Sequence, residues 1–164
     1  MNKAAFFDRD GTINVNTGHL HEAEKLVFVP GAPELIRSYN EQGYLVIVVT
    51  NQAGIAKGYY TENQMHELHR VMNERLQAEY GAHIDAFYFC PHHPDFTGEC
   101  DCRKPKTGML ERAIREHDID SKKSIMFGDK EHDIICAQKI GIEGRYIQKE
   151  LELTDRAQWD RTEE

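Results

Sequence analysis

Two carboxylates near the start of the chain, Asp8 and Asp10, directly follow an apolar run at residues 4–7. The run predicts a short buried strand, and Asp8 lies where that strand would end. In open α/β sheets, sites form at the carboxyl ends of strands, where one carboxylate can be a nucleophile or metal ligand and the other an acid/base. Gly11 lets the backbone turn sharply beside them. On its own, this pattern is equally typical of a solvated turn.

Polar groups also follow two other predicted strands. Thr50 and Asn51 come after an apolar, β-branched run at residues 44–49, and Asp129 comes shortly after a run at residues 124–127. Runs of this kind are typical of strands buried on both faces of a parallel sheet. Because the carboxyl ends of parallel strands meet at one edge, we expect these groups to converge with the first two carboxylates.

The acidic residues match what the transfer of a phosphoryl group requires, namely an oxygen nucleophile, a metal ion and an acid for the leaving group. We expect Asp8 to be the nucleophile and Asp10 to protonate the leaving oxygen and later to deprotonate water. Asp8 and Asp129 can hold Mg²⁺, which prefers oxygen ligands. Asp133 follows Asp129 by one helical turn and is expected to orient these ligands without binding the metal ion itself.

The phosphoryl oxygens also need fixed donors and a positive charge. Thr50 offers a hydroxyl group, Asn51 a backbone N–H, and Lys104 or Lys130 an ammonium group. Lys104 alone would be typical of a solvated loop. Its position after a cysteine-rich loop and before Pro105 favours a role in the site.

The cysteine-rich loop at residues 90–102 has the ligand spacing of a structural zinc site. Its candidate ligands are Cys90, His92 or His93, Cys100 and Cys102. Three thiolates and one imidazole form a closed tetrahedral Zn²⁺ site, which is structural because no coordination position stays open. The metal would rigidify a long irregular loop and fix the two cations that directly follow it.

Predicted strands and helices alternate along the chain. Strands are expected at residues 4–7, 44–49, 86–89, 124–127 and 142–147, and helices at residues 33–41, 61–80, 108–116 and 131–140. This alternation predicts an α/β fold with a doubly wound parallel sheet and helices on both faces. Thr61 and Gln64 fit a capping box, and Cys136 fits a buried packing position. The tail from residue 151 is polar, and Trp159 is expected to pack back onto the core.

The chain has 164 residues and a formal net charge of −8, which suggests one domain over residues 1–164. The negative charge argues against a general nucleic-acid or acidic-membrane binder, and it means that an anionic substrate needs local cations or a metal ion. We see no signal peptide at the N-terminus and no apolar run of transmembrane length. We therefore expect a cytoplasmic monomer without disulfides that acts on a small phosphorylated metabolite, with no nucleic-acid or membrane partner.

Four short motifs resemble those of the haloacid dehalogenase (HAD) superfamily of phosphatases in order and spacing. They are Asp8-Arg9-Asp10-Gly11-Thr12, Thr50-Asn51, Lys104, and Gly128-Asp129 with Asp133. The resemblance implies that Asp8 forms a phospho-aspartyl intermediate and that Asp10 is the acid/base, which also binds Mg²⁺ through its backbone carbonyl. It further implies that Thr50 and Lys104 stabilise the phosphoryl group during a two-step hydrolysis.

The cysteine loop narrows this resemblance. Residues 90–94 and 100–105 are similar to two groups of HAD phosphatases, the D-glycero-D-manno-heptose 1,7-bisphosphate 7-phosphatases and the histidinol-phosphate phosphatases. Both groups have little or no cap domain, and this chain has no insertion long enough for one, so the loops themselves must select the substrate. The C-x-H spacing in these groups favours His92 over His93 as the zinc ligand.

Residues 10–15 with 18–22, 50–58 and 128–130 resemble the heptose enzymes more closely, which implies a role in carbohydrate metabolism that supplies lipopolysaccharide precursors. Lys130 stands where histidinol phosphatases more often carry arginine. The residues that the resemblance assigns to substrate binding are Arg9, Asn16, Thr17, Gly18, His19, Asn51, Gln52, Ala53, Arg103 and Lys130.

Three alternatives use the same features. Histidinol-phosphate hydrolysis would need the same machinery and is the main alternative. A DNA 3′-phosphatase is disfavoured by the net charge and by the lack of a kinase domain. A non-catalytic, zinc-stabilised binding module is disfavoured because every proposed catalytic position is occupied.

Overall fold

The structure is a computed structural model that describes the backbone of residues 1–162 and the side chains of residues 1–154. Its centre is a sheet of five parallel strands in the order β3-β2-β1-β4-β5. The strands are β1 (Ala4–Phe7), β2 (Leu45–Asn51), β3 (Ala86–Cys90), β4 (Ile125–Gly128) and β5 (Glu143–Tyr146). The chain winds outward from β1 to β3 and then returns to β4 on the other side, so the winding direction reverses beside β1. Ligand sites of open α/β sheets form at such a reversal.

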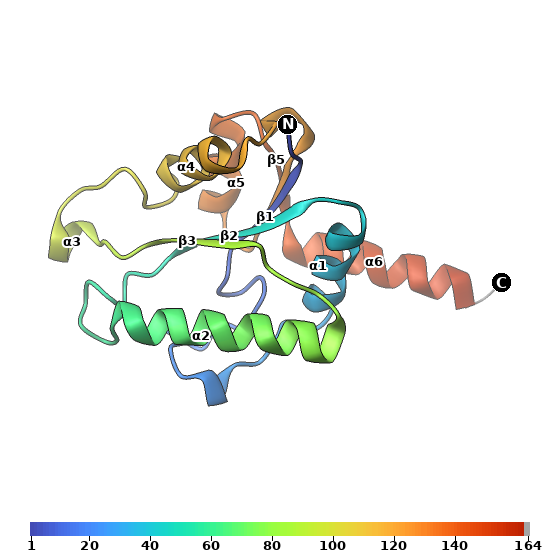
Figure 1. Cartoon of the computed structure of the whole chain (residues 1–164), viewed down its shortest axis with the longest axis horizontal. Helices are drawn as coiled ribbons and strands as arrows, with labels where there is room; N and C mark the ends of the chain where they lie inside the picture. The colour runs from blue at the N-terminus through green and yellow to red at the C-terminus, as the bar shows by residue number, and fades with distance from the viewer. Residues whose placement is uncertain (163–164) are drawn as a thin grey trace.

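Helices cover both faces of the sheet, as the alternation predicted (Figure 1). They are α1 (Ala32–Glu41), α2 (Glu62–Arg75), α3 (Pro94–Thr97), α4 (Gly108–His117), α5 (Glu131–Lys139) and α6 (Ile147–Thr162), with shorter helical turns at Ala23–Lys25, Leu76–Tyr80 and Ser121–Lys123. In Figure 1, α4 and α5 lie above the sheet, and α1, α2 and α6 lie below it. The doubly wound α/β architecture is therefore confirmed.

The neighbouring strands β1 and β2 bury both of their faces, which explains their continuous apolar sequences. Alternate residues belong to two separate core clusters, because successive side chains of a strand point to opposite faces. Ala5, Phe7, Val46 and Val48 pack with α1 and α2, whereas Ala4, Phe6, Ile47 and Val49 pack with α4 and α5. All eight of these residues are completely buried. The end of β1 is therefore held rigidly at the centre of the molecule.

The predicted capping box at the start of α2 is present. Thr61 Oγ1 accepts a hydrogen bond from Gln64 N at 3.2 Å, and Gln64 Oε1 accepts one from Thr61 N at 2.8 Å. The helix continues through a π-helical turn at Leu76–Tyr80 and stops at Gly81, whose φ is 65°. The helix predicted over residues 61–80 is thus confirmed in extent, with a π-helical last turn.

The C-terminal part differs from the expected polar tail. The fifth strand ends at Tyr146, and α6 begins at once with Ile147. Ile147 is buried in the core cluster that the sheet forms with α1 and α2, and Leu151 packs against the same cluster. Both can do so because residues four apart share one face of a helix. Trp159 lies outside the described side chains. Within the described part of the chain, no helix combines the length and the apolar content needed to cross a membrane.

Candidate active site

Asp8 lies at the carboxyl end of β1 and forms a buried ion pair with Lys104. Lys104 Nζ donates to Asp8 Oδ1 at 2.8 Å, to Asp133 Oδ1 at 2.7 Å and to the carbonyl of Val49 at 2.9 Å. All three ammonium donors are therefore used, and the lysine is only 3% exposed. Lys104 is therefore a buried cation beneath the cavity and not a solvated loop lysine.

Asn51 ties the loop that carries Lys104 to the end of β2. Asn51 Oδ1 accepts a hydrogen bond from Lys104 N at 3.0 Å, and Asn51 Nδ2 donates to the Lys104 carbonyl at 3.3 Å. These two hydrogen bonds join the end of β2 to a loop more than fifty residues further along the chain. The side chain of Asn51 therefore positions the interior cation.

The carboxylates around Lys104 carry more charge than one ammonium group can balance. Burial raises the pKa of Asp8 to about 8, with Asp133 and Asp10 adding to the rise and Lys104 opposing it. Burial alone would lower the pKa of Lys104, but Asp8 and Asp133 outweigh burial and raise it. The site therefore has an excess of negative charge that a further cation would relieve.

The residues present fit a divalent cation. Carboxylate oxygens of Asp8, Asp129 and Asp133 all lie within 4.8 Å of one another. Asp129 Oδ1 is buried and has no hydrogen-bond partner among the described residues, so it is free to bind a metal ion. Gly11 makes this approach possible, because a Cβ atom there would lie 2.1 Å from Asp129 Oδ2. A set of carboxylate oxygens is the ligand type that Mg²⁺ prefers.

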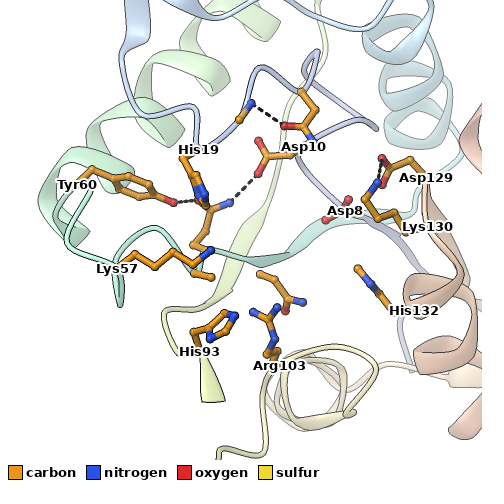
Figure 2. A pocket seen from close by; sticks show the side chains of 15 residues that line it. Asp8, Asp10, His19, Lys57, Tyr60, His93, Arg103, Asp129, Lys130 and His132 are labelled. Carbon is orange, nitrogen blue, oxygen red and sulfur yellow. Dashed lines mark hydrogen bonds and ion pairs between the residues drawn. The ribbon is translucent and has the colours of Figure 1, made fainter. Parts of the chain in front are cut away.

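Asp10 is held in one orientation from two sides. Its Oδ1 accepts hydrogen bonds from Arg9 Nη2 at 2.9 Å, Arg9 Nε at 3.1 Å and Asn14 Nδ2 at 3.0 Å. Its Oδ2 accepts one from Gln52 Nε2 at 3.1 Å, and Gln52 in turn accepts from Tyr60 (Figure 2). A carboxyl group fixed in this way, with its side chain still 22% exposed, is suited to proton transfer.

Asp8 and Asp10 open into a cavity of about 310 Å³ whose walls carry both signs of charge. Asp8, Asp10 and Asp129 form its acidic part. Lys57, His93 and Arg103 lie across the cavity from Asp129 and Lys130 (Figure 2). An anionic ligand can therefore contact cations at some distance from the carboxylates.

Most of the predicted site residues line this cavity, namely Asp8, Asp10, Asn16, Gly18, His19, Asn51, Gln52, Ala53, Arg103, Asp129 and Lys130. Thr50, Lys104 and Asp133 are buried beneath it. Arg9 is also fully buried, and its donors face Asp10 and the protein interior, so its side chain does not reach the cavity that a substrate would enter. Thr17 is exposed and lies outside the cavity lining.

The cavity is also lined by four residues that were not predicted to bind substrate or to take part in catalysis, Lys57, Tyr60, His93 and His132. Lys57 lies within the stretch at residues 50–58, and His132 directly precedes Asp133. Proximity to the motifs could have suggested these two. The inward position of His93 depends on the path of the cysteine loop, which residue spacing does not reveal.

The cysteine loop brings three sulfur atoms together. Sγ atoms of Cys90, Cys100 and Cys102 lie within 4.8 Å of one another, with Cys90 and Cys100 separated by 3.6 Å. Burial raises the pKa of the Cys90 thiol, and the neighbouring Cys102 raises it further. A cation among the three sulfurs would reverse this rise and stabilise thiolates. The donor set therefore fits a zinc ion.

Neither histidine has a ring nitrogen within this group of sulfurs. His92 and Cys102 line one cavity of about 290 Å³, so His92 is near the sulfurs. His93 Nδ1 instead accepts a hydrogen bond from Asp95 N at 3.1 Å at the start of α3, and His93 lines the main cavity. Cys136 is not part of the sulfur group and is buried in the core, as predicted.

Comparison with known proteins agrees with the fold. A family model described as HAD-hydrolase-like matches residues 101–158. D-glycero-beta-D-manno-heptose-1,7-bisphosphate 7-phosphatase of Haemophilus ducreyi is 41% identical over 149 residues, which cover 88% of this chain and 82% of that protein. The protein of the same name from Haemophilus influenzae is 47% identical over 138 residues, covering 82% and 74%.

Solved structures show the same relationship. D,D-heptose 1,7-bisphosphate phosphatase from B. bronchiseptica, crystallised with magnesium and phosphate, has a TM-score of 0.79 and 30% identity, covering 87% of this chain and 78% of that one. The chain therefore belongs to the HAD-like hydrolases and, within them, to the family of D-glycero-D-manno-heptose-1,7-bisphosphate 7-phosphatases.

Proposed function

We propose that this chain removes the 7-phosphate of D-glycero-D-manno-heptose 1,7-bisphosphate through a phospho-aspartyl intermediate. The observation that carries the proposal is the pairing of Asp8 and Asp10 at one end of a cavity lined by cations. About 310 Å³ is enough space for a sugar phosphate. The names of the relatives support the choice of substrate.

In the first step, a carboxylate oxygen of Asp8 attacks phosphorus and the bond from phosphorus to the sugar oxygen breaks. Asp10 donates a proton to that oxygen as it leaves. Lys104 contacts Asp8 at 2.8 Å and holds the carboxylate in place for the attack. Thr50 Oγ1 accepts from Gln52 Nε2 at 2.8 Å, which leaves the hydroxyl proton of Thr50 free to donate to a phosphoryl oxygen.

In the second step, Asp10 takes a proton from water, and the resulting hydroxide attacks phosphorus. Inorganic phosphate leaves and the Asp8 carboxylate is restored. Asp8, Asp129 and the backbone carbonyl of Asp10 would hold Mg²⁺, which supplies positive charge that keeps Asp8 ionised and neutralises the phosphoryl oxygens. Asp133 serves a different purpose, because its two oxygens accept from Lys104 Nζ and from Lys130 N.

We further propose that residues 1–164 act as one uncapped domain, as a monomer in the cytoplasm, on a small phosphorylated metabolite. In this proposal, residues 90–102 bind structural Zn²⁺ through Cys90, His92, Cys100 and Cys102, with the three gathered sulfurs as support. The zinc ion would then fix Arg103 at the cavity wall. Among the cavity residues, Arg103, Lys57 and Lys130 are proposed to contact the sugar phosphate.

Phosphate release from heptose 1,7-bisphosphate, compared with release from histidinol phosphate, tests the substrate. The wild-type chain is expected to prefer the bisphosphate, to require Mg²⁺ and to stop when a chelator is added. Asp8→Asn keeps the shape of the side chain but removes the nucleophile, so phosphate release should fall to the background rate. A preference for histidinol phosphate would contradict the substrate, and full activity of Asp8→Asn would contradict the mechanism.

A further inference from the structure

A buried arginine stands directly behind the acid/base carboxyl group. Arg9 is completely buried, although a guanidinium group is among the groups most costly to remove from water. Two of its donors, Nε and Nη2, bind Asp10 Oδ1, and Nη2 also donates to the carbonyl of Leu20 at 2.9 Å. These contacts leave Nη1, at the other edge of the guanidinium plane, to find an acceptor elsewhere.

His69, on α2, supplies that acceptor. Its Nε2 lies 3.2 Å from Arg9 Nη1, and its ring stacks on Phe87 with the centroids 4.3 Å apart and the planes 10° from parallel. Burial, together with the nearby charge of Arg9, lowers the pKa of His69 to about 2, so the ring is neutral. Because the guanidinium group can only donate, Nε2 must accept and the proton of the ring must be on Nδ1.

We propose that His69 is a positioning residue for this reaction, holding Arg9 so that Arg9 orients Asp10 for proton transfer to the leaving oxygen. The chain of contacts runs from α2 through the interior to the loop after β1. Phe87 limits rotation of the imidazole ring, and the ring sets the plane of the guanidinium group. The proposal rests on the proposed function, because Asp10 has a proton to transfer only if the chain hydrolyses phosphate esters.

His69 is 3% exposed and does not line the main cavity, so it cannot contact the substrate. Asn14 and Gln52 also hold Asp10, and both are buried, Asn14 in the loop after β1 and Gln52 directly after β2. Among the described residues, the contact from His69 connects this carboxyl group, through Arg9, to helix α2. Its loss would leave a buried donor of Arg9 without a partner and free the guanidinium plane to rotate.

The test compares two substrates that differ in their need for an acid. The leaving oxygen of heptose 1,7-bisphosphate is an alkoxide that requires a proton, whereas 4-nitrophenyl phosphate releases a stable anion. His69→Phe keeps the stacked ring but removes the acceptor. We expect kcat/KM for the bisphosphate to fall about 10- to 100-fold and kcat/KM for 4-nitrophenyl phosphate to fall less than about threefold, since acid catalysis contributes about 10²–10⁴-fold in rate.

Two variants serve as controls. His69→Gln retains an acceptor and should restore most of the activity lost in His69→Phe. His66→Phe alters a neighbouring histidine of α2 that packs on Phe89 and makes no contact with Arg9, so it should leave both substrates unaffected. Equal losses on the two substrates in His69→Phe, or a loss with His69→Gln as large as with His69→Phe, would overturn the proposal.

A measurement on the wild-type chain covers the case in which His69→Phe does not fold. Nitrogen-15 NMR of the histidine rings should show His69 as a neutral ring protonated at Nδ1. A ring protonated at Nε2, or a doubly protonated ring at neutral pH, would also overturn the proposal. If the wild-type chain hydrolyses neither substrate, the proposed function fails, and this spectrum still tests the contact between His69 and Arg9.

Discussion

Lys104 shows how one residue organises the site. It is a single ammonium group between Asp8 and Asp133, at 2.8 Å and 2.7 Å, with its side chain 1% exposed. A role in the site was expected from its position after the cysteine loop and before Pro105. Its complete burial and its contact with Asp133 were not, because they depend on how the loop folds back over the sheet. Residue spacing suggests which groups meet but not which of them lose contact with water.

Replacing Lys104 should destabilise the protein as well as inactivate it. Lys104→Met leaves two buried carboxylates without their cation, and we expect the free energy of unfolding to fall by about 3 kcal/mol. Urea denaturation in the absence of Mg²⁺ measures this change. Lys106→Met is the matched control, because Lys106 makes an exposed pair with Glu99 and should change stability by less than about 0.5 kcal/mol. Similar values for the two variants would contradict the buried ion pair.

His69 should make the stability of the protein depend on pH below the ordinary histidine range. Burial, followed by the nearby charges of Arg9 and His66, lowers its pKa in the folded chain from the ordinary value of 6.5 to about 2. The unfolded chain therefore binds a proton that the folded chain does not, so stability is fully present above pH 6.5 and falls as the pH decreases. The loss at pH 5 from this residue is about 2 kcal/mol. Urea denaturation of wild type and His69→Gln at pH 7 and pH 5 measures it, and an identical pH dependence in both would contradict the buried neutral ring.

At the scale of elements, the strands were the easiest part to predict. The runs at residues 4–7 and 44–49 are apolar throughout, and buried parallel strands require this pattern. The last helix, α6, was missed because Ile147 had been assigned to the strand and Leu151 to the polar tail, although both pack on the core. The loop after β3 was correctly expected to be largely irregular, but the short helix α3 within it was not foreseen.

The cysteine loop is expected to bind zinc and thereby to fix Arg103 at the cavity, and both expectations can be tested. We expect about one zinc ion per chain in the purified protein and its loss in Cys100→Ser, because a closed site needs all four ligands. Arg103 should then lose its fixed position, and KM for the bisphosphate should rise. Cys136→Ala is the control, since Cys136 lies outside the sulfur group and should retain zinc. Metal analysis that finds no zinc in the wild-type chain would contradict this account.

At the scale of the whole molecule, the fold explains why the site is where it is. The sheet reverses its winding direction beside β1, and the functional groups come from the ends of β1, β2 and β4 and from the loop after β3. The formal net charge is −8, yet Lys57, Arg103 and Lys130 line the main cavity. The chain therefore places some of its positive charge where an anionic substrate would bind, which the total charge alone could not show.

The central claim is that Asp8 carries the phosphoryl group during turnover. The most direct measurement is mass spectrometry of the chain after acid quenching during steady-state hydrolysis of heptose 1,7-bisphosphate. The account predicts one added phosphoryl group on the peptide that contains Asp8, and no such group in Asp8→Asn. Rapid turnover by the wild-type chain with no phosphoryl group on that peptide, or with one at another residue, would contradict it.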